Sequence, residues 1–118
     1  MDLMPTFADL AGIKVDHEID GKSLVPIWLE GKKGDRERTL IWVRREGNFR
    51  HQGRCYYAIR QGDWKLLQNH PFEPMQLVNL RDDPEEQKPL PASHPQARKL
   101  MTRLMAHIQK AGNKAWQK

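Results

Sequence analysis

Apolar and polar residues alternate with a helical period at both ends of the chain and with shorter, strand-like runs in the middle. Near the N-terminus the apolar positions predict a helix of about two turns that ends at Gly12; they are Leu3, Phe7, Leu10 and Ala11. The segment 14–35 is rich in turn-forming residues, among them Asp20-Gly21 and Pro26. It predicts a loop with one helical turn at 23–30.

The middle of the chain predicts three or four antiparallel strands. Residues 39–43 are β-branched and aromatic, which favours a strand. Residues 55–60 and 63–68 flank Gln61-Gly62, a plausible tight hairpin connection. Residues 75–80 form a further predicted strand.

Two helix starts follow the strands. The run Asp83-Pro84-Glu85-Glu86 predicts a single helical turn, with Asp83 as its cap and Glu86 reaching back as in a capping box. The second start, at His94-Pro95, opens a helix that ends at Gly112. Its apolar face comprises Ala97, Leu100, Met101, Leu104, Ile108 and Ala111.

This order of elements predicts an α+β fold in which a small antiparallel sheet of three to four strands packs against a C-terminal helix. The length of 118 residues suits one compact domain. We divide it into a linking helix and loop (1–35), the sheet (36–92) and the C-terminal helix (93–118). The helix covers one face of the sheet, and the sequence offers no obvious cover for the other face. No apolar run approaches the roughly 20 residues of a membrane span, so no membrane partner is expected.

The net charge of +5 is concentrated in two segments. Residues 36–65 carry +5 and residues 93–118 carry +6, whereas 1–35 and 66–92 carry −3 each. Basic stripes of this kind are usually solvated faces. A free-standing basic module that binds nucleic acid or acidic glycans remains the alternative function, although nucleic acid is the less favoured partner because aromatic residues are not interleaved with the basic ones on the last helix.

The residue types of common catalytic and metal sites are present without the required spacing. Gly21-Lys22-Ser23 resembles the end of a phosphate-binding loop, but Asp16 stands where that motif needs glycine. The five histidines are isolated in sequence, and Cys55 has no spaced partner. We therefore expect neither a catalytic residue nor a metal ligand in this chain.

The segment 44–54 is the strongest candidate for binding. It reads as an exposed loop that concentrates basic side chains: Arg44, Arg45, Arg50, His51 and Arg54. Guanidinium groups on such a loop suit sulfate, phosphate or carboxylate ligands. Solvation of the loop, or pairing with the acidic segments on either side, explains the same residues.

Four segments, in order, resemble the C-terminal end of the sulfatase family, the formylglycine-dependent sulfuric ester hydrolases of the alkaline-phosphatase-like superfamily. Asp2-Leu3-Met4-Pro5-Thr6 with Leu10-Ala11-Gly12 is similar to D-L-x-P-T-x-x-x-L-A-G, and Asp20-Gly21-Lys22-Ser23-Leu24 is similar to D-G-x-S-L. Residues 58–66 (AIRQGDWKL) resemble A-[VI]-R-x-G-D-W-K-L. A weaker match joins Asn79-Leu80 to Asp83-Pro84-Glu85-Glu86, with Asn79 in place of the family's Asp and Pro89 in place of its Asn.

The resemblance implies that this chain is the C-terminal subdomain of a sulfatase that acts on a sulfated carbohydrate or an aryl sulfate. The chain would begin just inside the helix that links it to the catalytic domain. The parent enzyme would use a formylglycine nucleophile and calcium, but the motif C/S-x-P-S/T-R is absent here and Cys55 precedes Tyr56, Tyr57 and Ala58. The subdomain would be inactive by itself and would buttress the upstream catalytic domain.

The resemblance also directs attention to the basic loop. Arg45, His51 and Arg54 become the predicted contacts to a sulfated carbohydrate, on the rim of the parent's active site. The apolar faces left without cover predict self-association when the catalytic domain is absent. A periplasmic or extracellular location is implied for the parent enzyme.

Overall fold

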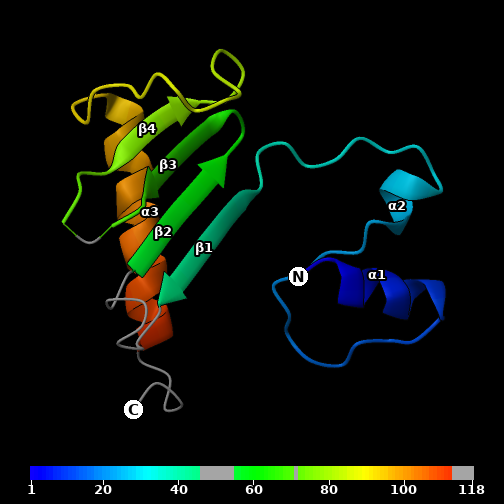
Figure 1. Ribbon diagram of the computed structural model, residues 1–118. Coiled ribbons are helices and arrows are strands. Elements are labelled where there is room, and N and C mark those ends of the chain that lie inside the picture. The colour runs from blue at the N-terminus through cyan, green and yellow to red at the C-terminus, as the bar shows by residue number, and fades with distance from the viewer. Residues whose placement is uncertain (46–54, 71, 113–118) are drawn as a thin grey trace. The chain divides into compact units, whose positions relative to one another are not determined.

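The computed structural model describes residues 1–45, 55–70 and 72–112, which form two compact units, Met1–Asp35 and Arg36–Lys118 (Figure 1). The first unit contains two helices, and the second contains a sheet and a long helix. Within the described residues, no helix is both long and apolar enough to cross a membrane.

The first unit is built on helix α1 (Leu3–Leu10) and the single turn α2 (Val25–Trp28). Both confirm the helical positions that the sequence predicts. Gly12 follows α1 with φ of +67°, a left-handed conformation that ends helices and that glycine adopts without a steric penalty. Pro26 lies in the first turn of α2, where a missing N–H costs nothing.

The second unit is a four-stranded antiparallel sheet with helix α3 (Pro95–Gly112) across one face (Figure 1). Its strands, in the order β1-β2-β3-β4, are Thr39–Arg45, Cys55–Gln61, Trp64–Gln68 and Gln76–Asn79. The α+β prediction is confirmed. The β2–β3 turn lies one residue later than predicted, at Gly62-Asp63, because Gly62 supplies the positive φ of +58° at its first central position.

One row of side chains runs straight across the sheet and forms the core with α3. Strand pairing places Ile41, Ile59, Leu66 and Leu77 side by side on one face. The last three are buried against α3, which contributes Ala97, Leu100 and Leu104. The apolar side chains at every second position of the strands thus pack against the apolar face of α3 in one layer.

The turn at residues 83–86 corrects the sequence prediction. No helical turn forms there, because Glu86 has a φ of +58°, which is incompatible with a right-handed helix. Asp83 caps the turn instead, and its carboxylate accepts the backbone N–H groups of Gln87 (3.1 Å) and Lys88 (2.8 Å). The Glu86 carboxylate does not reach back to the cap and pairs with Lys65 on the sheet.

Candidate functional site

In the first unit, the family-like segment at residues 2–12 is hydrogen-bonded to the one at residues 20–24. The Asp2 carboxylate accepts the backbone N–H of Lys22 at 3.0 Å, and Thr6 Oγ1 accepts the backbone N–H of Leu24 at 2.9 Å. Thr6 is completely buried and also donates its hydroxyl proton to the Asp2 carbonyl at 2.6 Å. The two bonds of Thr6 satisfy its buried hydroxyl, and the bonds to Lys22 and Leu24 hold the loop to α1.

Gly21 lies where the loop comes closest to α1. A Cβ added to Gly21 would stand 2.3 Å from the Met1 carbonyl oxygen and 2.9 Å from Pro5 Cγ, so only glycine fits. Two residues later, Ser23 donates to the Asp9 carboxylate at 2.5 Å and accepts the N–H of Val25 at 3.2 Å. The resemblance to a phosphate-binding loop therefore reflects packing of the loop and the start of α2.

The family-like segment at residues 58–66 forms most of the β2–β3 hairpin. Ile59 and Leu66 enter the core, Arg60 Nε donates to the Gly62 carbonyl at 3.1 Å, and the Asp63 carbonyl accepts the N–H of Leu80 at 2.7 Å. The ring of Trp64 packs on that of His94 with centroids 5.1 Å apart, beside the start of α3. Trp64 is thus a packing residue of the second unit.

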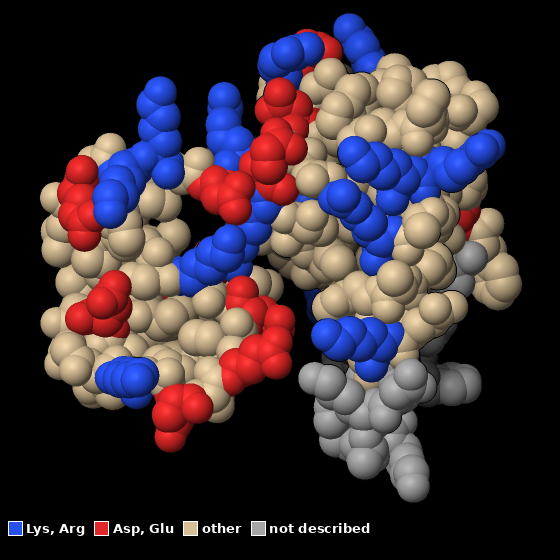
Figure 2. All heavy atoms as spheres, turned by 180° about the vertical axis from the view of Figure 1, so that it is seen from behind, with Lys and Arg blue, Asp and Glu red and all other residues tan. Residues whose placement is uncertain are grey.

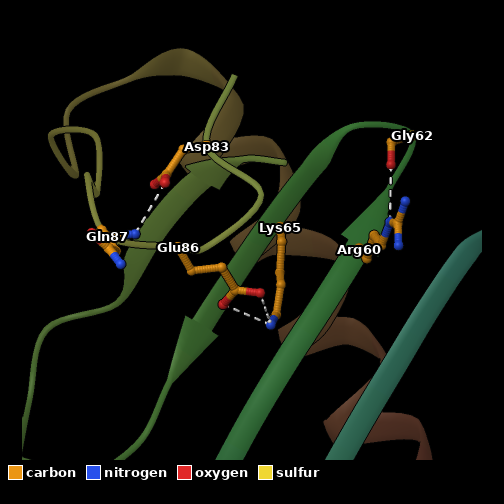
Figure 3. A network of polar contacts seen from close by, with 6 residues as sticks. All are labelled: Arg60, Gly62, Lys65, Asp83, Glu86 and Gln87. Atoms are coloured by element: carbon orange, nitrogen blue, oxygen red, sulfur yellow. Dashed lines mark hydrogen bonds and ion pairs between the residues drawn. The ribbon is translucent and has the colours of Figure 1, made fainter. Parts of the chain in front are cut away.

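Lys65 and Glu86 form a partly buried ion pair on the face of the sheet opposite α3. Lys65 Nζ lies 2.6 Å from Glu86 Oε1 and 2.8 Å from Oε2, and the side chains are 25% and 29% exposed (Figure 3). Lys65 is paired in register with Val78, which is itself buried. The charge of Lys65 is thus already neutralised within the chain, so Lys65 is a poor candidate for an anion ligand.

We expect the Lys65–Glu86 pair to contribute about 1 kcal/mol of coupling, because partial burial reduces screening by solvent. A double-mutant cycle of Lys65→Met and Glu86→Gln, read by urea unfolding, measures this coupling. The matched control is the exposed Lys32–Glu30 pair, which has a similar distance of 2.7 Å and should couple by only a few tenths of a kcal/mol. Additive losses at Lys65 and Glu86 would contradict the assignment.

Of the three predicted substrate contacts, only Arg45 belongs to the described residues. Arg45 is the last residue of β1 and pairs in register with Cys55, whereas His51 and Arg54 lie outside the described residues. Arg44 was expected in a loop but belongs to β1, and its guanidinium carbon lies 5.9 Å from the centre of the Tyr56 ring. The strand continues through the register pairs Arg44–Tyr56 and Arg45–Cys55, and the contact of Arg44 with the Tyr56 ring adds to this cross-strand pairing.

The sheet face opposite α3, for which the sequence offered no obvious cover, carries an exposed apolar patch centred on Trp42. Trp42 is 49% exposed and shares this face with Leu40, Ala58 and Leu67, next to Arg44 and Tyr56. The alternation of Leu40, Trp42 and Arg44 was the available signal, since residues two apart point to the same side of a strand. Trp42 thus leaves a large apolar side chain exposed on this face of the sheet.

The described residues offer no constellation for catalysis or metal binding. They contain no group of three or more His, Cys, Asp and Glu side chains placed to hold a metal ion. Cys55 begins strand β2 and is followed by Tyr56, so it does not fit a formylglycine precursor.

A hydrogen bond from Arg81 to the Asp82 carboxylate at 3.2 Å raises the pKa of Arg81, a guanidinium that is charged at any ordinary pH.

Comparison with known proteins gives consistent matches. The family model for the C-terminal region of N-sulphoglucosamine sulphohydrolase matches residues 1–114. The chain is 29% identical over 115 residues to N-acetylglucosamine-6-O-sulfatase of Bacteroides thetaiotaomicron, a match that covers 93% of this chain and 21% of that protein. It is 32% identical over 91 residues to arylsulfatase K of Gallus gallus, covering 73% of this chain and 17% of that protein.

Two solved structures share the fold. BT4656, solved in complex with its substrate D-glucosamine-2-N,6-O-disulfate, aligns with a TM-score of 0.66 and 27% identity over 94% of this chain and 23% of its own. BT1596, a 2-O GAG sulfatase, aligns with a TM-score of 0.57 and 27% identity over 94% of this chain and 24% of its own. The chain therefore spans about a fifth of the length of the proteins that it matches.

Proposed function

Because this chain belongs to the family of N-sulphoglucosamine sulphohydrolase C-terminal regions, we propose that it is the C-terminal subdomain of an enzyme that removes sulfate from a sulfated carbohydrate. The observation that carries the proposal is the match of the family model to residues 1–114, nearly the whole chain. The relatives support the substrate class, since one acts on N-acetylglucosamine 6-O-sulfate by its name and another was solved with a disulfated glucosamine.

Within that enzyme, the chain supports the catalytic domain. The exposed patch around Trp42 and the apolar side of α1, where Leu3, Phe7 and Leu10 are all more than half exposed, supply the contact surfaces. In water these side chains leave apolar area unburied, and covering them would stabilise both partners. The same surfaces support self-association when the catalytic domain is absent, and the parent's location is proposed to be periplasmic or extracellular.

Sulfatase chemistry uses formylglycine and calcium; the sequence lacks the motif C/S-x-P-S/T-R, and the described residues hold no cluster of carboxylates that would suit calcium. We assign to this chain a part in substrate selection, on account of its basic segment 44–54. Arg45, His51 and Arg54, on or next to the β1–β2 hairpin, would bind anionic groups of the carbohydrate that a small aryl sulfate lacks.

The proposed function is tested in the protein that joins this chain to its catalytic domain. We expect sulfate release from a sulfated glucosamine, measured by ion chromatography, and a fall in kcat/KM of about tenfold or more for Arg45→Ala, His51→Ala or Arg54→Ala. Losing one charge-assisted hydrogen bond costs about 1.5–3 kcal/mol. A small aryl sulfate should be turned over almost unchanged by the same variants.

Arg36→Ala is the matched control, because Arg36 is exposed and lies before the sheet. It should leave both substrates unaffected. Absence of sulfate release by the unsubstituted protein would contradict the proposed function itself. Equal losses on the glucosamine and the aryl sulfate would contradict only the assignment of the three residues to substrate selection.

A further inference from the structure

Helix α3 is a cationic element without a single acidic residue. Residues 93–118 contain no Asp or Glu, and α3 exposes Arg98, Lys99, Arg103, His107 and Lys110. Figure 2, which views the molecule from behind Figure 1 and thus from the α3 side of the sheet, shows blue side chains along this helix. A basic helix face is often simply solvated, so the binding argument depends on where these charges lie and on what neutralises them.

Within the part of the chain that the structure describes, no carboxylate neutralises the charges on α3. Among the residues that the structure describes, Arg98, Lys99, Arg103 and Lys110 form no ion pair with a carboxylate. Arg103 has one side-chain partner there, the neutral amide oxygen of Gln61, to which it donates a hydrogen bond. That bond orients the guanidinium and leaves its charge available to an anion.

Three of these charges lie in a line. Lys99, Arg103 and Lys110 are spaced i, i+4 and i+11, which places them within a narrow sector of the helix, away from the buried Leu100 and Leu104. At 1.5 Å per residue the row spans about 16 Å. It is an extended row of positive charge and not a pocket for a single anion.

Repulsion within this row of positive charges destabilises α3 in the isolated chain. Lys99 and Arg103 are like charges at i and i+4, a spacing that destabilises a helix. Lys110 alone has a favourable position, in the last turn, where a cation complements the helix dipole. A polyanion laid along the helix would remove the repulsion and release its own condensed counterions.

We propose that the row of Lys99, Arg103 and Lys110 binds a linear sulfated polysaccharide along α3, and so holds a polymeric substrate on the enzyme. The identity of the polymer rests on the proposed function, while its binding rests on the charge and geometry of α3. The exposed residues of α3 include no Phe, Tyr or Trp, so the helix lacks the large aromatic rings on which the bases of single-stranded nucleic acid stack.

The test compares two variants that remove the same charge from different places. One is Lys99→Gln/Arg103→Gln/Lys110→Gln, and the control is Lys14→Gln/Lys33→Gln/Lys88→Gln, three lysines that are likewise exposed. Binding of size-fractionated heparin to the full chain is titrated at several salt concentrations. The α3 variant should bind heparin at least about tenfold more weakly than the unsubstituted chain. The slope of a plot of log Kd against log salt concentration should fall by about 2–3 for this variant, and both quantities should change little for the control.

Each other outcome overturns the proposal. Equal losses in the two variants would show that only overall charge matters. A second contrary result is that the unsubstituted chain binds duplex DNA as tightly as heparin and the α3 variant loses both affinities equally. That result would make the helix a surface for nucleic acid. Failure of the proposed function is a separate result, because it is read from sulfate release by the unsubstituted protein and not from heparin binding.

Discussion

Replacing Leu104 by Ala should lower the free energy of unfolding by about 2–5 kcal/mol, the range for large-to-small substitutions in well-packed cores. Leu104 is completely buried in α3 and belongs to the cluster that includes Ile59, Leu66 and Leu77 of the sheet. The loss is large against the roughly 5–15 kcal/mol that holds a domain of this size together. Urea unfolding followed by tryptophan fluorescence measures it.

Met105→Ala is the matched control for Leu104→Ala. Met105 is the next residue of the same helix but is exposed, so its truncation removes little buried area and should cost less than about 1 kcal/mol. A loss at Leu104 as small as that at Met105 would mean that α3 does not pack on the sheet as the structure shows.

The substitution Gly21→Ala should release the 20–24 loop from α1. The added methyl group would overlap the Met1 carbonyl oxygen, a backbone atom that cannot rotate away, and overpacking of this kind costs about 1–3 kcal/mol. The backbone N–H groups of Lys22 and Leu24, bonded to Asp2 and Thr6, should then exchange with solvent on the order of 10–100 times faster. Amide hydrogen exchange by NMR reads both positions directly.

Gly34→Ala provides the comparison within the same unit. A Cβ at Gly34 would lie 3.5 Å from Ile27 Cδ1, an ordinary contact, and its φ is not positive. Exchange at Lys22 and Leu24 should therefore stay at the level of the unsubstituted chain. If Gly21→Ala also leaves this exchange unchanged, the close approach at Gly21 does not hold the loop.

The motifs by which the family was recognised prove to be mainly structural. Asp2 and Thr6 of the first motif bond the backbone of the second, and Gly21 permits their approach. In the third, Gly62 makes the hairpin turn while Ile59 and Leu66 enter the core. Substrate selection is therefore expected in the segments that the motifs do not include, such as 44–54 and α3.

Much of the fold was predictable because its signals are local. The helical period of 97–111 and the alternation in 55–68 each follow from residues that are neighbours in sequence, and all seven elements lie close to their predicted positions. The exception was 83–86, where local capping preferences predicted a helical turn. The ion pair with Lys65, 21 residues away in sequence, accompanies a left-handed Glu86 instead.

The candidate site was less accessible to sequence reasoning. Composition identified the basic segments 36–65 and 93–118, and the motif order identified the family. Only the tertiary structure showed that Lys65 is already paired, that Arg44 packs on Tyr56, and that the charges of α3 have no acidic partner among the described residues. Charge is a property of each residue, whereas its availability to a ligand depends on which distant residues the fold brings beside it.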